Sequence, residues 1–352
     1  MRKQLLILVG GLLASGFCVA GDGFAGPLLI GLDSSSSALD PVSAEPLPTF
    51  ADFRQMDQTR RLTGQLQTAE LLKIMRLDPA LIADVVRRGT NDAQLAWGAA
   101  ELLTEWPVRR ALFETVLAAV SNRAPVALRY ACAAARQGEY DNALKLARFC
   151  QAHDGDNTVP WLVELWILAQ RKTGQHLERN PPLWTTNYRD YTVEACEARI
   201  RVLELAGYSA YAARRIGFKA ESDALLIARE LCKPPFDEAT KQLLRSSGES
   251  LQQTRQFLLG ELVGQTLERT MLALQPDADR NGAVTARLEV IGNRRERLRQ
   301  RLANIERNTV DYATEAQMVQ YFDDVLTLGE EAAMQKLIGS VKSPVPASHD
   351  DE

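Results

Sequence analysis

The residues best suited to chemistry form one short polar segment, 277–289. Asp277, Asp279 and Asn281 place side-chain oxygens at alternate positions, and Thr285 and Glu289 follow with two more oxygen-bearing side chains. Ca²⁺ prefers hard oxygen ligands such as carboxylates and carbonyl groups. The sequence therefore predicts calcium as the one candidate cofactor, with these five residues as its ligands.

This segment resembles the calcium loop of the EF-hand family. That loop has oxygen ligands at its first, third and fifth positions, glycine at the sixth and an apolar residue at the eighth. The matching residues are Asp277, Asp279, Asn281, Gly282 and Val284. The twelfth position, where the family has a bidentate glutamate, is Leu288, and the acid comes one residue later at Glu289. The alternative is a polar turn whose side chains accept backbone hydrogen bonds.

The N-terminus has the pattern of an export signal. Arg2 and Lys3 precede an apolar run over 5–17, which is short for a membrane span. The small residues Cys18 and Ala20 suit cleavage after Ala20. We therefore expect 1–20 to be a cleaved signal peptide and the mature chain to be periplasmic or secreted, with no transmembrane span. An uncleaved anchor is one alternative. Lipidation of Cys18 is another, although bulky Phe17 precedes it.

Cysteine usage fits export. Four cysteines follow the signal region: Cys132, Cys150, Cys196 and Cys232. An even number in an oxidising compartment predicts disulfides. The sequential pairing closes the shortest loops, and the other pairings stay open. The alternative is that these residues are small buried core residues, which free cysteines often are.

Other patterns that carry chemistry are missing from the sequence. The histidines His153, His176 and His349 share no metal-ligand spacing, and neither a glycine-rich phosphate loop nor a nucleophile motif occurs. The formal net charge of −4 gives no basis for nucleic-acid binding. The basic run at 294–301 is typical of a solvated helix, with contact to an anionic envelope component as the alternative.

Apolar residues recur with the helical period through nearly all of 49–342, and the breaks between these segments are short. Leu95, Ala99, Leu102 and Trp106 form one such stripe. Short connections between helices produce antiparallel neighbours. The predicted fold class is therefore all-α, with stacked antiparallel helix hairpins over 49–246 followed by a long C-terminal helical hairpin or bundle over 247–342.

One hairpin resembles the tetratricopeptide repeat. Its second helix carries a turn glycine, a tyrosine and small residues one turn apart: Gly138, Tyr140, Ala143, Ala147 and Cys150. The spacing of the breaks over about 91–172 also matches the tetratricopeptide period. The aromatic residue expected early in the first helix is absent. The resemblance implies a concave scaffold that holds peptides or proteins, and a generic α-hairpin is the alternative.

The remaining segments complete the predicted organisation. Residues 21–48 indicate a flexible Ser/Pro-rich linker, and 343–352 a disordered acidic tail. Two long helices near 248–274 and 285–307 flank the calcium segment, and the second has a heptad rhythm typical of a coiled coil. A long loop at 174–192 carries Trp184 and Tyr188. We expect both aromatics to pin the loop to the helices, with a ligand-binding lip as the alternative.

These patterns predict an exported, non-catalytic helical-repeat protein that acts as an interaction scaffold in the cell envelope, with an unidentified protein or peptide partner. One alternative is a calcium-dependent structural or adhesion module that uses 277–289. Another is an envelope enzyme on an α-superhelical scaffold. Lytic transglycosylases have such a scaffold and a catalytic glutamate followed by serine. Glu249 and Ser250 are similar to that pair, but the residues after them lack the family's polar, glycine-containing context.

Overall fold

The computed structural model describes residues 46–63, 77–89, 92–171, 177, 180–219, 221–232, 237–254, 256–274, 282–308 and 312–341. In these residues the chain is all-helical, with 15 helices and a single isolated bridge between Asn157 and Asn187 in place of a sheet. The all-α prediction is confirmed. The predicted signal peptide at 1–20, nearly all of the linker at 21–48 and the tail at 343–352 lie outside the described residues.

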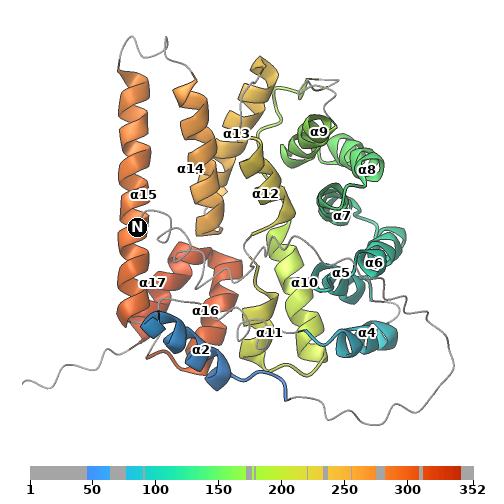
Figure 1. Ribbon diagram of the computed structural model, residues 1–352, viewed down its shortest axis with the longest axis vertical. Coiled ribbons are helices and arrows are strands. Elements are labelled where there is room, and N and C mark those ends of the chain that lie inside the picture. Colours follow the sequence, from blue (N-terminus) through green and yellow to red (C-terminus); the bar gives the residue numbers. More distant parts are fainter. Residues whose placement is uncertain are drawn as a thin grey trace, which may run out of the picture.

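The N-terminal half forms an array of antiparallel helices along one side of the molecule (Figure 1). Its members are α4 (Pro79–Arg88), α5 (Ala93–Leu102), α6 (Trp106–Ala119), α7 (Ala124–Arg136), α8 (Tyr140–His153) and α9 (Val159–Gln170). Local signals set the ends of these helices. Asp78 and Asp92 accept backbone N–H groups as N-caps, and Pro107 and Pro125 stand in the first turn of α6 and α7. The α7–α8 turn uses Gly138 at a φ of 80°.

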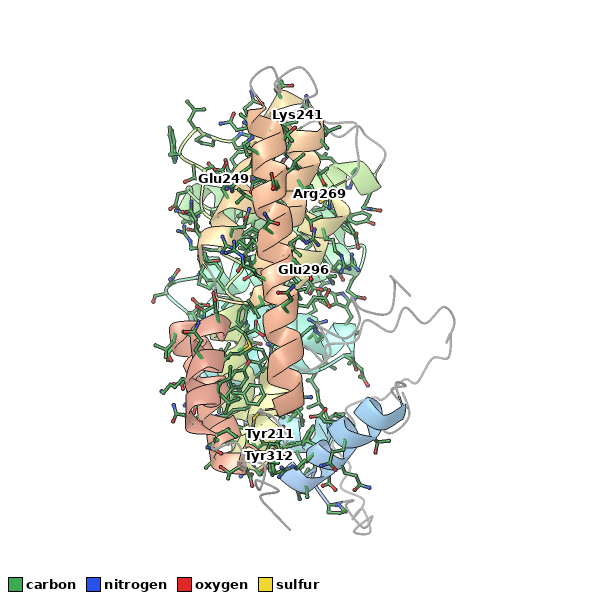
Figure 2. All side chains as sticks on the ribbon, turned by 90° about the vertical axis from the view of Figure 1, so that its left-hand side faces the viewer. Tyr211, Lys241, Glu249, Arg269, Glu296 and Tyr312 are labelled. Carbon is green, nitrogen blue, oxygen red and sulfur yellow. The ribbon has the colours of Figure 1, made fainter. Side chains whose placement is uncertain are left out.

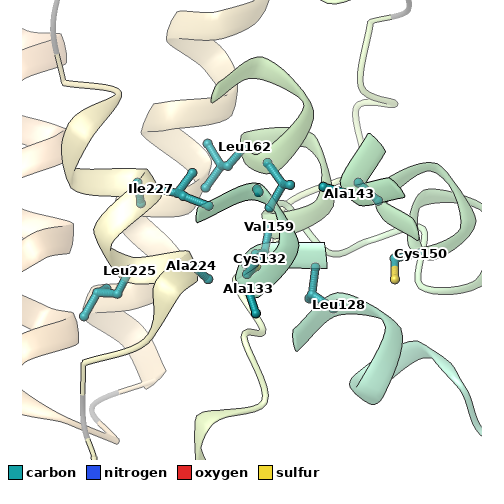
Figure 3. Close-up of a cluster of buried hydrophobic side chains, with 14 of the residues drawn as sticks. Leu128, Cys132, Ala133, Ala143, Cys150, Val159, Leu162, Ala224, Leu225 and Ile227 are labelled. Atoms are coloured by element: carbon teal, nitrogen blue, oxygen red, sulfur yellow. The ribbon is translucent and has the colours of Figure 1, made fainter. Parts of the chain in front are cut away.

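The middle of the chain covers the inner side of this array. It contains α10 (Thr192–Leu205), α11 (Ala210–Gly217) and α12 (Asp223–Glu230). The α10 helix packs on α5, and α12 packs on α7 and α9. Figure 3 shows Ile227 of α12 beside Leu162 of α9, and Ala224 of α12 beside Ala133 of α7. Helix α9 is consequently buried on all sides from Val159 to Leu168. The concave face that a tetratricopeptide-like scaffold would offer is therefore filled by the chain itself.

The C-terminal part comprises α13 (Glu238–Thr254), α14 (Leu258–Ala273), α15 (Ala283–Asn308), α16 (Glu315–Leu328) and α17 (Glu330–Ser340). The first described helix, α2 (Phe50–Thr63), lies near α16 and α17 in Figure 1. Figure 2 shows α15 running along the outer side. It contacts α14 through buried Ile291 and through ion pairs from Arg287 to Glu268 and from Arg294 to Glu261. In the described residues, the structure contains no helix with the length and apolar character needed to span a membrane.

The predicted single helix near 248–274 is wrong. The chain leaves helical geometry between Thr254 and Leu258, and α13 and α14 fold back on each other as a hairpin. The Gln256 side chain donates to the backbone carbonyls of residues 325 and 326, at 2.6 and 3.0 Å, so tertiary partners hold the break. At the crossing of the two helices, a Cβ on Gly264 would lie 2.7 Å from the Gly248 carbonyl oxygen. Only glycine permits this approach.

The predicted disulfides are also wrong, because all four cysteines are free. Cys132, Cys150 and Cys196 are buried in α7, α8 and α10, while Cys232 follows α12 and is partly buried. Figure 3 shows Cys132 and Cys150 at separate places in the core. Burial raises the pKa of the Cys132 thiol well above its ordinary value and that of Cys150 to about 12. These cysteines serve as small apolar core residues, as the alternative interpretation held.

Candidate functional site

The predicted calcium ligands fall mainly outside the described residues. The structure does not describe residues 275–281, which include Asp277, Asp279 and Asn281. Calcium binding therefore stays a prediction. Gly282 has a φ of 67°, the conformation that a sharp loop turn needs. Thr285 and Glu289 follow on α15 and are exposed. Among the described residues, no group of three histidine, cysteine, aspartate or glutamate side chains could hold a metal ion.

Glu249 and Ser250 are directed to different environments. Glu249 is exposed on α13, where Figure 2 labels it. Ser250 is buried, and its hydroxyl oxygen accepts the backbone N–H of Tyr188 at 2.7 Å. Ser250 thus ties the long loop to α13, and Glu249 lies outside that contact.

The two aromatic residues of the long loop at 174–192, Trp184 and Tyr188, lie in different environments. Tyr188 is 5% exposed and packs in the core, as expected. Trp184, in contrast, is 68% exposed, and its neighbour Leu183 is 78% exposed. The two exposed residues are the central pair of a tight turn, because the Thr185 backbone N–H donates to the Pro182 carbonyl at 2.9 Å. The expectation that Trp184 pins the loop is therefore wrong, since its ring faces solvent.

The chain that follows this turn is held by a polar clasp on the α8–α9 connection. We define the clasp as Asp154, Asp156, Asn157, Arg189 and Tyr191. The Arg189 guanidinium pairs with both aspartates, the Tyr191 hydroxyl donates to Asp154 at 2.8 Å, and Asn157 donates to the Arg189 carbonyl at 2.8 Å. The hydrogen bond from Arg189 lowers the pKa of Asp156. The clasp holds Tyr191 at a φ of 56°, the one positive φ of a non-glycine residue in the described chain.

A pocket of about 180 Å³ opens beside the clasp, at the start of α10. It lies where the chain before α10, the middle helices and the α13–α14 hairpin meet, and a junction between packed elements is a common place for a ligand site. Its lining comprises residues 188–194, Leu225 of α12, and five residues around the α13–α14 turn, namely Leu251, Thr254, Gln256, Phe257 and Gly260. These segments are distant in the sequence, so no local pattern could have predicted the pocket.

Three oxygen-bearing side chains of the pocket lining lack a partner: the buried hydroxyls of Tyr188 and Thr192 have no hydrogen bond, and the carboxyl of Glu194 has no ion pair among the described residues. Only 3% of Thr192 is exposed. Burial raises the pKa of the Glu194 carboxyl, and the negative charges of Asp190 and Glu197 raise it further. Such groups are typical of places where a ligand completes the interactions.

A buried ion cluster supports the pocket from behind. Glu101 of α5 accepts from Arg129 of α7 at 2.6 and 2.8 Å, and Arg199 of α10 lies 3.5 Å away. Burial alone would raise the pKa of Glu101, but the charge and hydrogen bonds of Arg129 together with the Arg199 charge lower it to about 2. Asp190, in the pocket wall, accepts from the Thr192 backbone N–H and the Ser222 hydroxyl. The wall is therefore fixed before any ligand arrives.

Comparison of the chain with protein-family models, with curated proteins and with solved structures found no match. A functional conclusion therefore has to come from the exposed turn at 182–185 and the pocket.

Proposed function

We propose that this protein is an exported, non-catalytic interaction scaffold of the cell envelope, and that it binds a partner protein through the turn at 182–185. The observation that carries this proposal is the exposure of Leu183 and Trp184 side by side at the tip of that turn. Export rests on the N-terminal sequence pattern alone.

The turn suits protein recognition because its base is rigid. The Thr185 hydroxyl donates to the Gly155 carbonyl at 3.0 Å, and the backbone N–H groups of Thr186 and Asn187 donate to the Asp156 carbonyl at 3.0 and 2.9 Å. A preorganised turn loses little conformational entropy when it binds. Binding then gains from the full apolar area of its tip.

Burial of the Trp184 ring would supply a large part of the binding free energy. A tryptophan side chain has about 150–250 Å² of surface, and burial of apolar surface stabilises by about 25 cal/mol per Å². Since two thirds of Trp184 is exposed, burial in an apolar pocket of a partner would contribute roughly 3 kcal/mol. Tryptophan is among the residues most often found to dominate interface affinity.

The test is affinity capture from the protein's own envelope fraction with the full chain as bait. The variant replaces Leu183 and Trp184 with serine, and the control replaces the exposed residues Leu205 and Leu328 with serine. We expect one stoichiometric partner to co-purify with the wild type and the control, and its yield to fall about tenfold or more with the turn variant. Equal recovery with both variants would disprove the turn as the binding site.

Two further measurements test the other parts of the proposal. Mass spectrometry of the native protein should find a mature N-terminus after Ala20, and a retained Met1 would contradict export by signal cleavage. Incubation with isolated peptidoglycan should release no soluble fragments. Release of muropeptides would favour the enzyme on an α-superhelical scaffold instead.

A further inference from the structure

The pocket at the start of α10 has one apolar wall and one polar end. Leu251 and Phe257, from the α13–α14 hairpin, and Leu225 of α12 supply apolar surface. Thr192 and Glu194, from the first turn of α10, supply the oxygens. A cavity of about 150 Å³ accommodates a molecule the size of benzene, so the volume of about 180 Å³ suits a short alkyl chain with a small head group.

The charges around the pocket select the sign of that head group. Glu194 is exposed, and Asp190 and Glu197, whose charges act on it, are also acidic. Two cations lie close by, and both are paired elsewhere. Arg189 of the lining pairs with Asp154 and Asp156. Arg129, whose charge acts on Glu194, pairs with Glu101. An anionic ligand would add to this repulsion, whereas a cation would compensate it.

We propose that this pocket binds a short alkyl chain that ends in an ammonium or guanidinium group. The alkyl chain lies along Leu225, Leu251 and Phe257. The cation pairs with the Glu194 carboxylate, and one of its N–H groups donates to the Thr192 hydroxyl oxygen, which has no hydrogen-bond partner within the protein. Ammonium and guanidinium carry several donors each, so one head group can serve both oxygens.

This ligand class goes beyond the interaction scaffold proposed above and does not depend on the turn at 182–185. The same chemistry occurs in free alkylamines and in lysine or arginine side chains of a peptide. The turn variant therefore tests the proposed function, and variants of the pocket test this inference separately.

The experiment titrates the full chain with n-butylammonium, n-butanol and butyrate, which match in size and differ in charge. Methyl resonances of Val193, Leu225 and Leu251, which line the pocket, report binding there by NMR. We expect n-butylammonium to bind in the millimolar range, about tenfold or more tighter than the other two, because a hydrogen bond to a charged group is worth about 1.5–3 kcal/mol. Equal or tighter binding of n-butanol or butyrate would overturn the inference.

Matched variants locate the cation. Glu194→Gln should weaken n-butylammonium binding about tenfold or more, because it removes the ion-pair partner. Glu197→Gln, on an exposed residue of the same helix outside the pocket lining, removes only a nearby charge and should weaken binding by no more than about threefold. Thr192→Val keeps the shape and removes the hydroxyl, so it should weaken binding about threefold or more. Equal affinity of the two glutamate variants, each with a wild-type melting curve, would refute the assignment.

A last measurement distinguishes a free alkylamine from a basic side chain of a peptide as the ligand. N-acetyl-lysine methylamide carries the same head group on a peptide backbone. Tighter binding than n-butylammonium, accompanied by the same methyl shifts, assigns the pocket to a basic side chain of a peptide. Weaker binding assigns it to a free amine. Failure of both probes to shift the methyl resonances of these three residues would overturn the inference.

Discussion

Glu330 should make the stability of this protein fall as the pH rises toward neutrality. It opens α17, is 3% exposed, and its carboxylate accepts the Leu258 backbone N–H at 2.7 Å. Its own backbone N–H donates to the Gln256 carbonyl at 3.0 Å, so this residue joins α17 to the start of α14. Burial raises the pKa of the Glu330 carboxyl from 4.5 to about 7.

The direction of the effect follows from linkage. A carboxyl whose pKa is higher in the folded protein than in the unfolded chain binds its proton more tightly when folded. Its contribution to the free energy of unfolding is complete below pH 4.5 and is lost as the pH rises through about 7. A rise of this size corresponds to about 3 kcal/mol at most, since one pKa unit is worth about 1.4 kcal/mol.

The variant Glu330→Gln keeps an oxygen for the Leu258 N–H and removes the titration. Urea unfolding at pH 5 and pH 9 measures the outcome. We expect the variant to match the wild type at pH 5 and to exceed it by up to about 3 kcal/mol at pH 9. Glu315→Gln, on an exposed residue in the first turn of α16, is the control and should follow the wild type at both values. A constant difference between Glu330→Gln and wild type across the range would refute the reasoning.

Four other substitutions test the packing, the buried charges and the calcium prediction. Gly98→Ala places a Cβ 2.2 Å from a backbone oxygen of α10, so it should lower the free energy of unfolding in urea by about 1–3 kcal/mol. On α15, a Cβ at Gly292 meets nothing within 4 Å, so Gly292→Ala should raise the free energy of unfolding by up to about 1 kcal/mol. Arg129→Met leaves Glu101 buried without its main partner and should destabilise by about 3–5 kcal/mol, with retention of wild-type stability contradicting the structural role of that ion pair. Millimolar calcium should raise the Tm of the wild type but not of Asp277→Ala, and an unchanged wild-type Tm would leave 277–289 as a polar turn.

Several features of the structure have a local cause in the sequence. Gly138 ends one helix because a positive φ is easy only for glycine, and Asp78 and Asp92 begin helices because their carboxylates accept free backbone N–H groups. Small residues along α8 allow it to pack closely on α7, with Ala143 and Ala147 fully buried. These features are readable without knowledge of the rest of the chain.

Sequence signals failed where the deciding partner is distant. The helical period continues past Thr254, and the break before α14 is held by carbonyls about seventy residues further on. The cysteine count suggested disulfides, but the folded chain holds the thiols apart as core residues. Trp184 and Tyr188 belong to the same loop, yet one faces solvent and the other is buried.

The sequence by itself determined that this protein is built of helices and which residues recur with the helical period, because backbone hydrogen bonds and side-chain periodicity act within a few residues. Only the tertiary structure decided which apolar faces meet. In the folded chain, α10 and α12 cover the inner side of the array, and the turn at Leu183 and Trp184 stays exposed. Residues of α10, α12 and the α13–α14 hairpin together line the pocket. The physical reason is that apolar burial is not directional, so the periodicity of one helix does not specify its partner.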